Sequence, residues 1–119
     1  MNKLLLALII ALLPALAGAQ SFREAQYKTL ATVAAGSVTA SYATALSNTK
    51  PLRMLDVVNT ADCLILISFD ASTNHFIVPA QTSLTLGWND FALYEKDNVS
   101  IKYSGSACTT GSVYFSGVY

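Results

Sequence analysis

The chain has 119 residues, a hydrophobic fraction of 53%, and seven basic side chains balanced by seven acidic ones. This length allows one domain with one compact core. Because no run of like charge occurs, neither a nucleic-acid-binding surface nor a patch for an anionic membrane is expected. Six Tyr, five Phe and one Trp supply apolar volume for a core that needs no cofactor. The expected partners are proteins, copies of the same chain included, with a glycan as the alternative ligand and no small-molecule ligand.

The first nineteen residues have the three parts of a secretory signal peptide. Lys3 gives a positive start, Leu4 to Leu13 form an unbroken apolar run, and Ala17-Gly18-Ala19 has the small residues that signal peptidase accepts. Cleavage after Ala19 would leave a nearly neutral mature chain that begins at Gln20. A stable membrane span is not expected, because a bilayer crossing takes about 20 apolar residues. The alternative is that residues 1–19 are retained as an apolar N-terminal helix that takes part in assembly.

Residues 20–36 are expected to form an N-terminal arm ahead of a domain of residues 37–119. The stretch Phe22–Ala35 fits either a flexible arm or an extra strand. An arm would suit assembly by exchange of strands between subunits. Ser37–Thr44 alternates weakly between apolar and polar residues, and we expect it to be the first strand of the domain.

From Leu52 onward the chain consists of short segments of apolar alternation, each closed by Asn, Asp, Ser, Thr, Gly or Pro. This pattern is typical of an antiparallel all-β domain. Cys63–Phe69 is apolar on both faces, which indicates a central strand covered on both sides. Leu52, Met54 and Val57 are expected to point inward. The other expected strands are Leu52–Asn59, His75–Val78, Ser83–Gly87, Val99–Tyr103 and Ser112–Tyr119.

These segments predict a single antiparallel β-sandwich of about seven strands, of the jelly-roll or the immunoglobulin-like kind. The last strand runs to Tyr119 without a polar tail. A terminus of this kind is usually held in the sheet.

Cys63 and Cys108 are the two cysteines of the chain. In an oxidising compartment they could form one intramolecular disulfide, and closing a loop of that length would stabilise the fold by about 4 kcal/mol. The alternative is that both thiols stay unpaired and act as small hydrophobic residues. A zinc site is not expected, because the chain has no CxxC and His75 is its single histidine.

No group of residues indicates catalysis, so no enzyme activity, catalytic residue, cofactor or metal site is predicted. Ser68, Asp70 and His75 are the residue types of a hydrolytic triad. Ser68, however, would lie in a strand without the sharp turn that exposes a nucleophile. We expect Asp70 and Asn74 to serve the turn between two strands, because their side chains hydrogen-bond the local backbone.

Three aromatic residues, Trp88, Phe91 and Tyr94, lie in a longer loop before Val99. With Tyr103 they could form an exposed platform that contacts a sugar or a neighbouring subunit. The alternative is burial, because aromatic side chains supply much of the hydrophobic stabilisation of a sandwich.

Several segments in the second half of the chain follow one another in a recognisable order: Leu52–Thr60, Leu66–Asp70 followed by His75–Ala80, Ile101–Ala107, and Gly111–Tyr114. Over roughly Ser37 to Tyr119 this order resembles small virion structural proteins of tailed bacteriophages and prophages. The resemblance implies a non-enzymatic β-sandwich that decorates or connects larger shells. The signal-like start and the two cysteines depart from this pattern, because phage proteins assembled in the cytoplasm need neither.

Two functional hypotheses follow. The first is a structural or decoration component of a phage-like virion that acts through subunit contacts. The alternative is an exported bacterial surface, filament or adhesin-like subunit located in the periplasm, at the cell surface or outside the cell. Export requires cleavage after Ala19 and favours a Cys63–Cys108 disulfide, whereas assembly in the cytoplasm predicts a retained start and free thiols.

Overall fold

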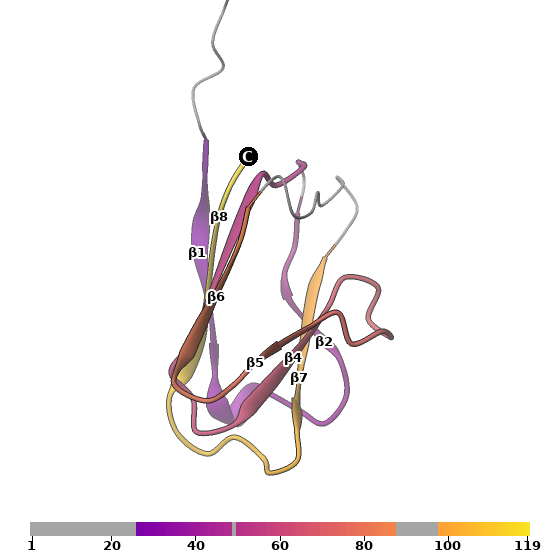
Figure 1. The fold of residues 1–119 in the computed structure, drawn as a ribbon, viewed down its shortest axis with the longest axis vertical. Helices are drawn as coiled ribbons and strands as arrows, with labels where there is room; N and C mark the ends of the chain where they lie inside the picture. The colour runs from indigo at the N-terminus through magenta and orange to yellow at the C-terminus, as the bar shows by residue number, and fades with distance from the viewer. Residues whose placement is uncertain (1–25, 49, 88–97) are drawn as a thin grey trace, which may run out of the picture.

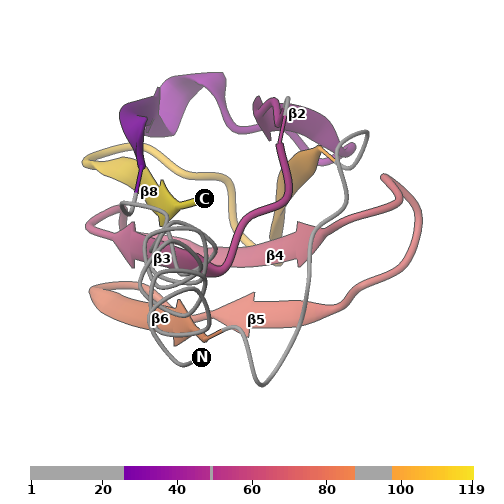
Figure 2. The same ribbon diagram turned by 90° about the horizontal axis from the view of Figure 1, so that it is seen from above.

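The structure, a computed structural model, describes residues 26–48, 50–87 and 98–119. These residues form two four-stranded antiparallel sheets that face each other (Figure 1, Figure 2). The predicted all-β sandwich is therefore confirmed, with eight strands in the described residues where about seven were expected. The elements are β1 (Tyr27–Ala34), the short 3₁₀ helix η1 (Ala35–Ser37), β2 (Ala43–Leu46), β3 (Met54–Asn59), β4 (Leu64–Ser68), β5 (Phe76–Val78), β6 (Thr82–Leu86), β7 (Val99–Ser104) and β8 (Ser112–Val118).

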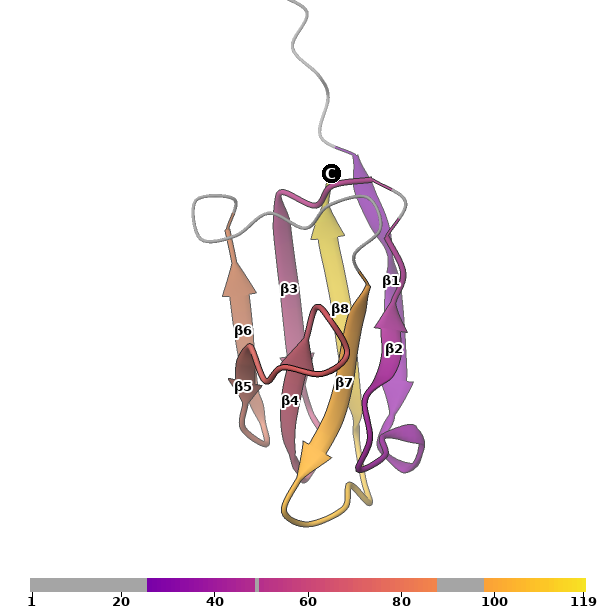
Figure 3. The same ribbon diagram turned by 90° about the vertical axis from the view of Figure 1, so that its right-hand side faces the viewer.

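The strand order is that of a jelly roll. Sheet A has the order β1-β8-β3-β6 and sheet B the order β2-β7-β4-β5 (Figure 3). β1 pairs with β8, β2 with β7, β3 with β6 and β4 with β5, so the chain is one long hairpin rolled into two sheets. Of the two kinds of sandwich that the sequence left open, this order corresponds to the jelly roll.

The core lies between the two sheets and follows from the twofold alternation of side chains along each strand. In β8, Val113 and Phe115 point inward and are buried, whereas the alternating Tyr114 and Ser116 are partly exposed. Each inward side chain therefore contacts residues of the opposite sheet rather than solvent.

β4 is an interior strand of sheet B, between β7 and β5. Ile65 and Ile67 face the core with no exposed surface, and Leu66 on the opposite face is also buried. The prediction of a strand covered on both sides is confirmed.

The expected first strand, Ser37–Thr44, is wrong. Ala35–Ser37 instead form η1, in which the Val38 N–H donates to the Ala35 carbonyl at 3.1 Å. This turn carries the chain from sheet A to sheet B, where β2 begins at Ala43. The weak alternation of the segment came from a crossing between sheets rather than from a strand.

The stretch that the sequence left open between an arm and an extra strand contains β1. Its residues 27–34 pair with β8 along one edge of sheet A. At the start of this pairing the Tyr119 N–H donates to the Gln26 carbonyl at 2.8 Å. The expected attachment of Tyr119 to the sheet is thus confirmed.

Met54 was expected to point inward, and this is wrong. Met54 is exposed, whereas Leu52 and Leu55 are both buried. The chain bends at Arg53, whose N–H donates to the Val118 carbonyl at 2.7 Å. This bend interrupts the strict alternation, so residues three apart face the same side.

Some predictions lie outside the described residues: the signal-like helix of residues 1–19 and the aromatic residues Trp88, Phe91 and Tyr94. Within the described ranges, no helix has the length and apolar character that a membrane crossing requires.

Candidate functional site

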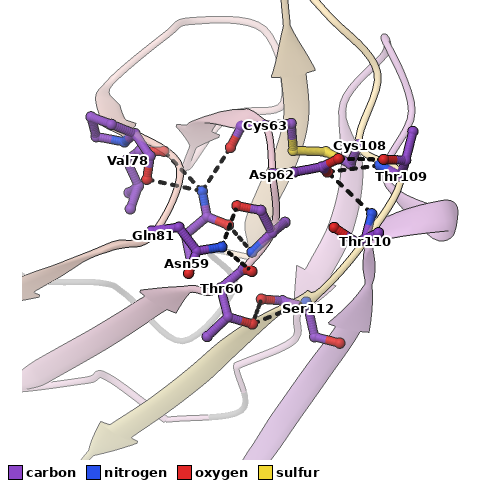
Figure 4. The surroundings of a disulfide bond; sticks show 12 residues. Asn59, Thr60, Asp62, Cys63, Val78, Gln81, Cys108, Thr109, Thr110 and Ser112 are labelled. Atoms are coloured by element: carbon purple, nitrogen blue, oxygen red, sulfur yellow. Dashed lines mark hydrogen bonds between the residues drawn. A yellow bond between two sulfur atoms is a disulfide. The ribbon is translucent and has the colours of Figure 1, made fainter.

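Four connections between the sheets gather at one end of the sandwich, which we call the cystine end: residues 35–42, 60–63, 79–81 and 105–111 (Figure 3). Cys63 and Cys108 form a disulfide there, with their Cα atoms 4.9 Å apart (Figure 4). The bond joins the β3–β4 connection to the β7–β8 loop, and both cysteines are buried. The predicted disulfide is confirmed.

Asn59, the last residue of β3, is a buried hydrogen-bonding centre beside the disulfide (Figure 4). Its Nδ2 donates to the carbonyl oxygens of Cys63 at 2.9 Å, Val78 at 3.1 Å and Pro79 at 3.1 Å. Its Oδ1 accepts from the Ala61 N–H at 3.0 Å. One side chain therefore satisfies backbone groups of the β3–β4 connection and of the segment where β5 ends, which is the role expected of a buried amide.

Asp62, on the β3–β4 connection, hydrogen-bonds two residues of the β7–β8 loop. Its carboxylate accepts a hydrogen bond from the Thr109 hydroxyl and bonds from the N–H groups of Thr109 at 2.8 Å and Thr110 at 3.1 Å. These donors stabilise the charged form, the Thr109 hydroxyl most of all, and lower the pKa of Asp62 to about 2. Asp62 is exposed, so it braces a loop at the surface.

Gly111 completes the cystine end because no other residue fits its position. Its φ is +85°, and a Cβ atom there would lie 2.2 Å from the Thr60 carbonyl oxygen. The Gly111 carbonyl in turn accepts from the Ala35 N–H at 3.0 Å. The β7–β8 loop is thus packed directly on the backbone of two other connections.

The polar side chains of the cystine end hydrogen-bond the backbone of its connections. A shallow pocket of about 210 Å³ lies beside it, lined by Val58–Thr60 and Gln81–Ser83, none of which carries a charge. No three His, Cys, Asp or Glu side chains in the described part of the chain come close enough to hold a metal ion.

Asp70 has the turn role that its sequence context predicts. Its Oδ1 accepts from the N–H groups of Ser72 at 2.8 Å and Thr73 at 2.7 Å, and its Oδ2 accepts from the Thr73 hydroxyl at 2.7 Å. The Thr73 N–H contributes most to holding the pKa of Asp70 far below its ordinary value.

Ser68, Asp70 and His75 do not form a triad. The Ser68 hydroxyl donates to Asp70 at 2.8 Å, and His75 Nδ1 accepts from the Phe69 N–H at 3.2 Å. Ser68 is fully buried, so its hydroxyl is not available to a substrate. The three side chains make hydrogen bonds within the β4–β5 turn.

The outer face of sheet A carries an unusual set of exposed apolar side chains. Tyr27 is 79% exposed, Leu30 58%, Val58 41% and Met54 36%. Of the large hydrophobic residues that the described ranges expose, only Ile77 lies on sheet B. Exposed apolar residues that gather on one face indicate a contact surface rather than random exposure.

The strand register places three of these residues, Tyr27, Met54 and Val58, in rows across sheet A. Tyr27 and Met54 both pair with Val118 of β8, so the three form one row. Val58 pairs with the partly exposed Tyr114 in a second row. Between the rows lies Asp56, whose carboxylate accepts a hydrogen bond from the Thr85 hydroxyl.

The sequence predicted the possible Cys63–Cys108 pair and the turn role of Asp70. Neither the hydrogen bonds of Asn59 nor the apolar outer face of sheet A was predicted. In the sequence Asn59 stands out only as the last residue of an expected strand, because two of its acceptors, the carbonyl groups of Val78 and Pro79, lie 19 and 20 positions further along the chain. A signal for the outer face was present, since Met54 and Val58 are four positions apart and share one face of a strand.

No protein-family model matches the sequence, and no curated protein gives a significant match. Among solved structures, the chain is similar to one from Bacillus endospore appendages, which are described as a novel family of disulfide-linked pili. The similarity has a TM-score of 0.48 and a sequence identity of 14%, and it covers 83% of this chain and 90% of that chain.

Proposed function

We propose that this protein is an exported, non-enzymatic structural subunit that assembles with copies of itself into a surface filament or a similar polymer. The observation that carries this proposal is the Cys63–Cys108 disulfide. Disulfides persist in oxidising compartments outside the cytoplasm and are rare inside it. The signal-like features of residues 1–19 support the same location.

The disulfide also favours this proposal over a virion component. Particle assembly in the cytoplasm predicts free thiols, whereas the described residues contain no free cysteine. The resemblance to phage virion proteins therefore remains a prediction from sequence. The jelly roll itself does not separate the two, because the fold is used by proteins of many functions.

Self-assembly is supported by the outer face of sheet A. Its four exposed apolar side chains lie on two strands of one sheet, and the charged Asp56 on that face is already hydrogen-bonded by Thr85. Burial of such a face against another subunit removes apolar area from water, which stabilises the contact by about 25 cal/mol per Å² before the cost of association.

The test compares two charge-introducing variants of the mature chain. Tyr27→Lys/Met54→Lys alters one row of the outer face, and Ile77→Lys alters an exposed apolar residue of sheet B as the matched control. All three positions are exposed, so each variant should fold and oxidise. Sedimentation and electron microscopy should show polymers for the wild type and for Ile77→Lys, and dispersed subunits for the double variant.

Intact mass without reduction tests export independently. Protein recovered from the cell exterior should have the mass of Gln20–Tyr119 less two hydrogens. A full-length chain with two free thiols would contradict export. Equal polymerisation of Tyr27→Lys/Met54→Lys and Ile77→Lys would contradict self-assembly through the outer face.

A further inference from the structure

A jelly roll leaves four strand edges, and edges that are long, regular and uncharged pair readily with other chains. Here the edges of sheet A are β1 and β6, and those of sheet B are β2 and β5. Comparison of the four shows that they are not equally protected.

Three of the edges carry features that hinder pairing. The register of β1 shifts between Lys28 and Ala31, and that of the four-residue β2 shifts between Thr44 and Leu46. Bulges of this kind twist an edge and interrupt its ladder of hydrogen bonds. β5 has only three residues and is followed directly by Pro79, which lacks the N–H that a ladder needs.

β6 has none of these features. Its five residues, Thr-Ser-Leu-Thr-Leu, pair with β3 in an unbroken register from Thr82 to Leu86. The strand contains no charged residue, proline or bulge. Among the described strands, none pairs with its outer edge. By the criteria that protect edges in natural sheets, β6 is an open pairing site.

The side chains of β6 indicate what kind of partner fits. Leu84 points toward the core but is only partly buried, so the partner strand should present an apolar side chain opposite it. Ser83 and Thr85 point to the outer face and are exposed. Hydroxyl side chains opposite them would form favourable cross-strand pairs.

A second β6 meets all of these requirements. Antiparallel pairing about a two-fold axis at Leu84 uses all five residues, and it places Leu84 opposite the partner's Leu84 and Ser83 opposite the partner's Thr85. A two-fold axis repeats the net charge of one edge on the facing edge, so an edge that pairs with itself should carry no net charge, and β6 carries none. The neutrality of β6 thus favours a second copy over a charged partner.

We propose that the free edge of β6 binds a second copy of this chain by antiparallel β6–β6 pairing, which joins the two A sheets into one sheet of eight strands. The inference rests on the proposed self-assembly and adds the β6 edge to the outer face as a second contact between subunits. Pairing also places two copies of the apolar outer face side by side on one continuous sheet, which doubles the apolar area that a further subunit could contact.

The experiment uses two double variants that share one substitution and differ only in the sign of charge at residue 83. In Ser83→Lys/Thr85→Lys, each lysine at 83 faces a lysine at 85 of the partner. In Ser83→Glu/Thr85→Lys, a glutamate faces that lysine instead. Both positions are exposed, so the folded monomer should tolerate either change, and the shared lysine at 85 lies beside Asp56 in both variants.

Sedimentation velocity of the oxidised mature chain over a range of concentrations measures the dimer dissociation constant. We expect the lysine–lysine variant to weaken the dimer about tenfold or more, because two like-charged pairs form across the axis, and the glutamate–lysine variant to retain it. Hydrogen exchange at residues 82–86 should slow on dimerisation in the wild type and in the glutamate–lysine variant.

Equal dimerisation of the two variants, or equal loss of the dimer in both, would overturn β6 pairing. If the wild type still polymerises in that case, the proposed function stands without this interface. Loss of polymers in Tyr27→Lys/Met54→Lys with an intact dimer would support both proposals and separate the two contacts.

Discussion

The sharpest test of the cystine end is the replacement Asn59→Asp, which changes one buried amide into a carboxyl group of nearly the same shape. In the wild type, Nδ2 donates to three carbonyl oxygens, those of Cys63, Val78 and Pro79. A carboxylate has no hydrogen to donate, so at neutral pH three acceptors would face a negative charge. The size of the side chain is kept, so the effect reports hydrogen bonding rather than a cavity.

The expected loss follows from the two N–H groups that disappear. Each buried acceptor left without a donor costs about 1–3 kcal/mol, and a buried charge without a partner costs about 3–5 kcal/mol. Two unpaired acceptors and one buried charge together predict that Asn59→Asp lowers the free energy of unfolding by about 5 kcal/mol or more at pH 7.

The loss should depend on pH in a defined direction. Burial and the facing carbonyl groups raise the pKa of the introduced carboxyl group in the folded state above its unfolded value. A raised pKa gives stability that is present at low pH and is lost as the pH rises through the folded value. The difference between Asn59→Asp and the wild type should therefore shrink as the pH falls toward 4.

Urea unfolding of the oxidised proteins at pH 7 and pH 4 measures both quantities. Asn98→Asp is the matched control, because Asn98 is exposed and the same chemical change there should cost less than about 0.5 kcal/mol. A loss below about 1 kcal/mol for Asn59→Asp at pH 7, or a difference from the wild type that grows as the pH falls, would refute the reasoning.

Two further predictions concern the same end of the sandwich. Reduction of the Cys63–Cys108 disulfide should lower the free energy of unfolding by about 4 kcal/mol, because the cross-link spans 45 positions and restricts the unfolded chain. Urea unfolding with and without reductant measures this loss; Cys63→Ala/Cys108→Ala should not respond to reductant, and a loss below about 1 kcal/mol would contradict the prediction. Asp62, whose pKa is lowered to about 2, should contribute stability that is present above pH 4 and is lost as the pH falls toward 2. Asp62→Asn should remove this contribution, so unfolding curves that keep the same difference between Asp62→Asn and wild type from pH 6 to pH 2 would argue against it.

Local pattern was enough to predict the strands β3 to β8. The alternation of apolar residues, the turn residues after Asn59 and Ser68, and the doubly apolar β4 are properties of adjacent positions, and the structure keeps them. The same reasoning failed at Ser37–Thr44, where small and polar residues alternate by chance along a connection. It also failed at Met54, because the bend at Arg53 depends on a hydrogen bond to Val118 at the far end of the chain.

The candidate site was predictable only in part for the same reason. Cys63 and Cys108 could be named as a possible pair, but their approach to 4.9 Å between Cα atoms depends on how β4 and β7 are placed in sheet B. Two of the acceptors of Asn59, the carbonyl groups of Val78 and Pro79, lie at the end of β5 and at the start of the β5–β6 connection, which no local rule relates to the end of β3. Which strand edges stay free is likewise a property of the finished sheets.

The sequence alone therefore determined the class of fold, the alternation that builds one core, the turn role of Asp70 and the two residues able to form a disulfide. Only the tertiary structure decided the jelly-roll order, the membership of β1 in sheet A, the outward direction of Met54 and the place of β6 at an edge of the described sheet A. The physical reason is range: periodicity and turn chemistry act between neighbours, whereas β1 and β8 pair across most of the chain, and such pairings are set by the burial of the whole core.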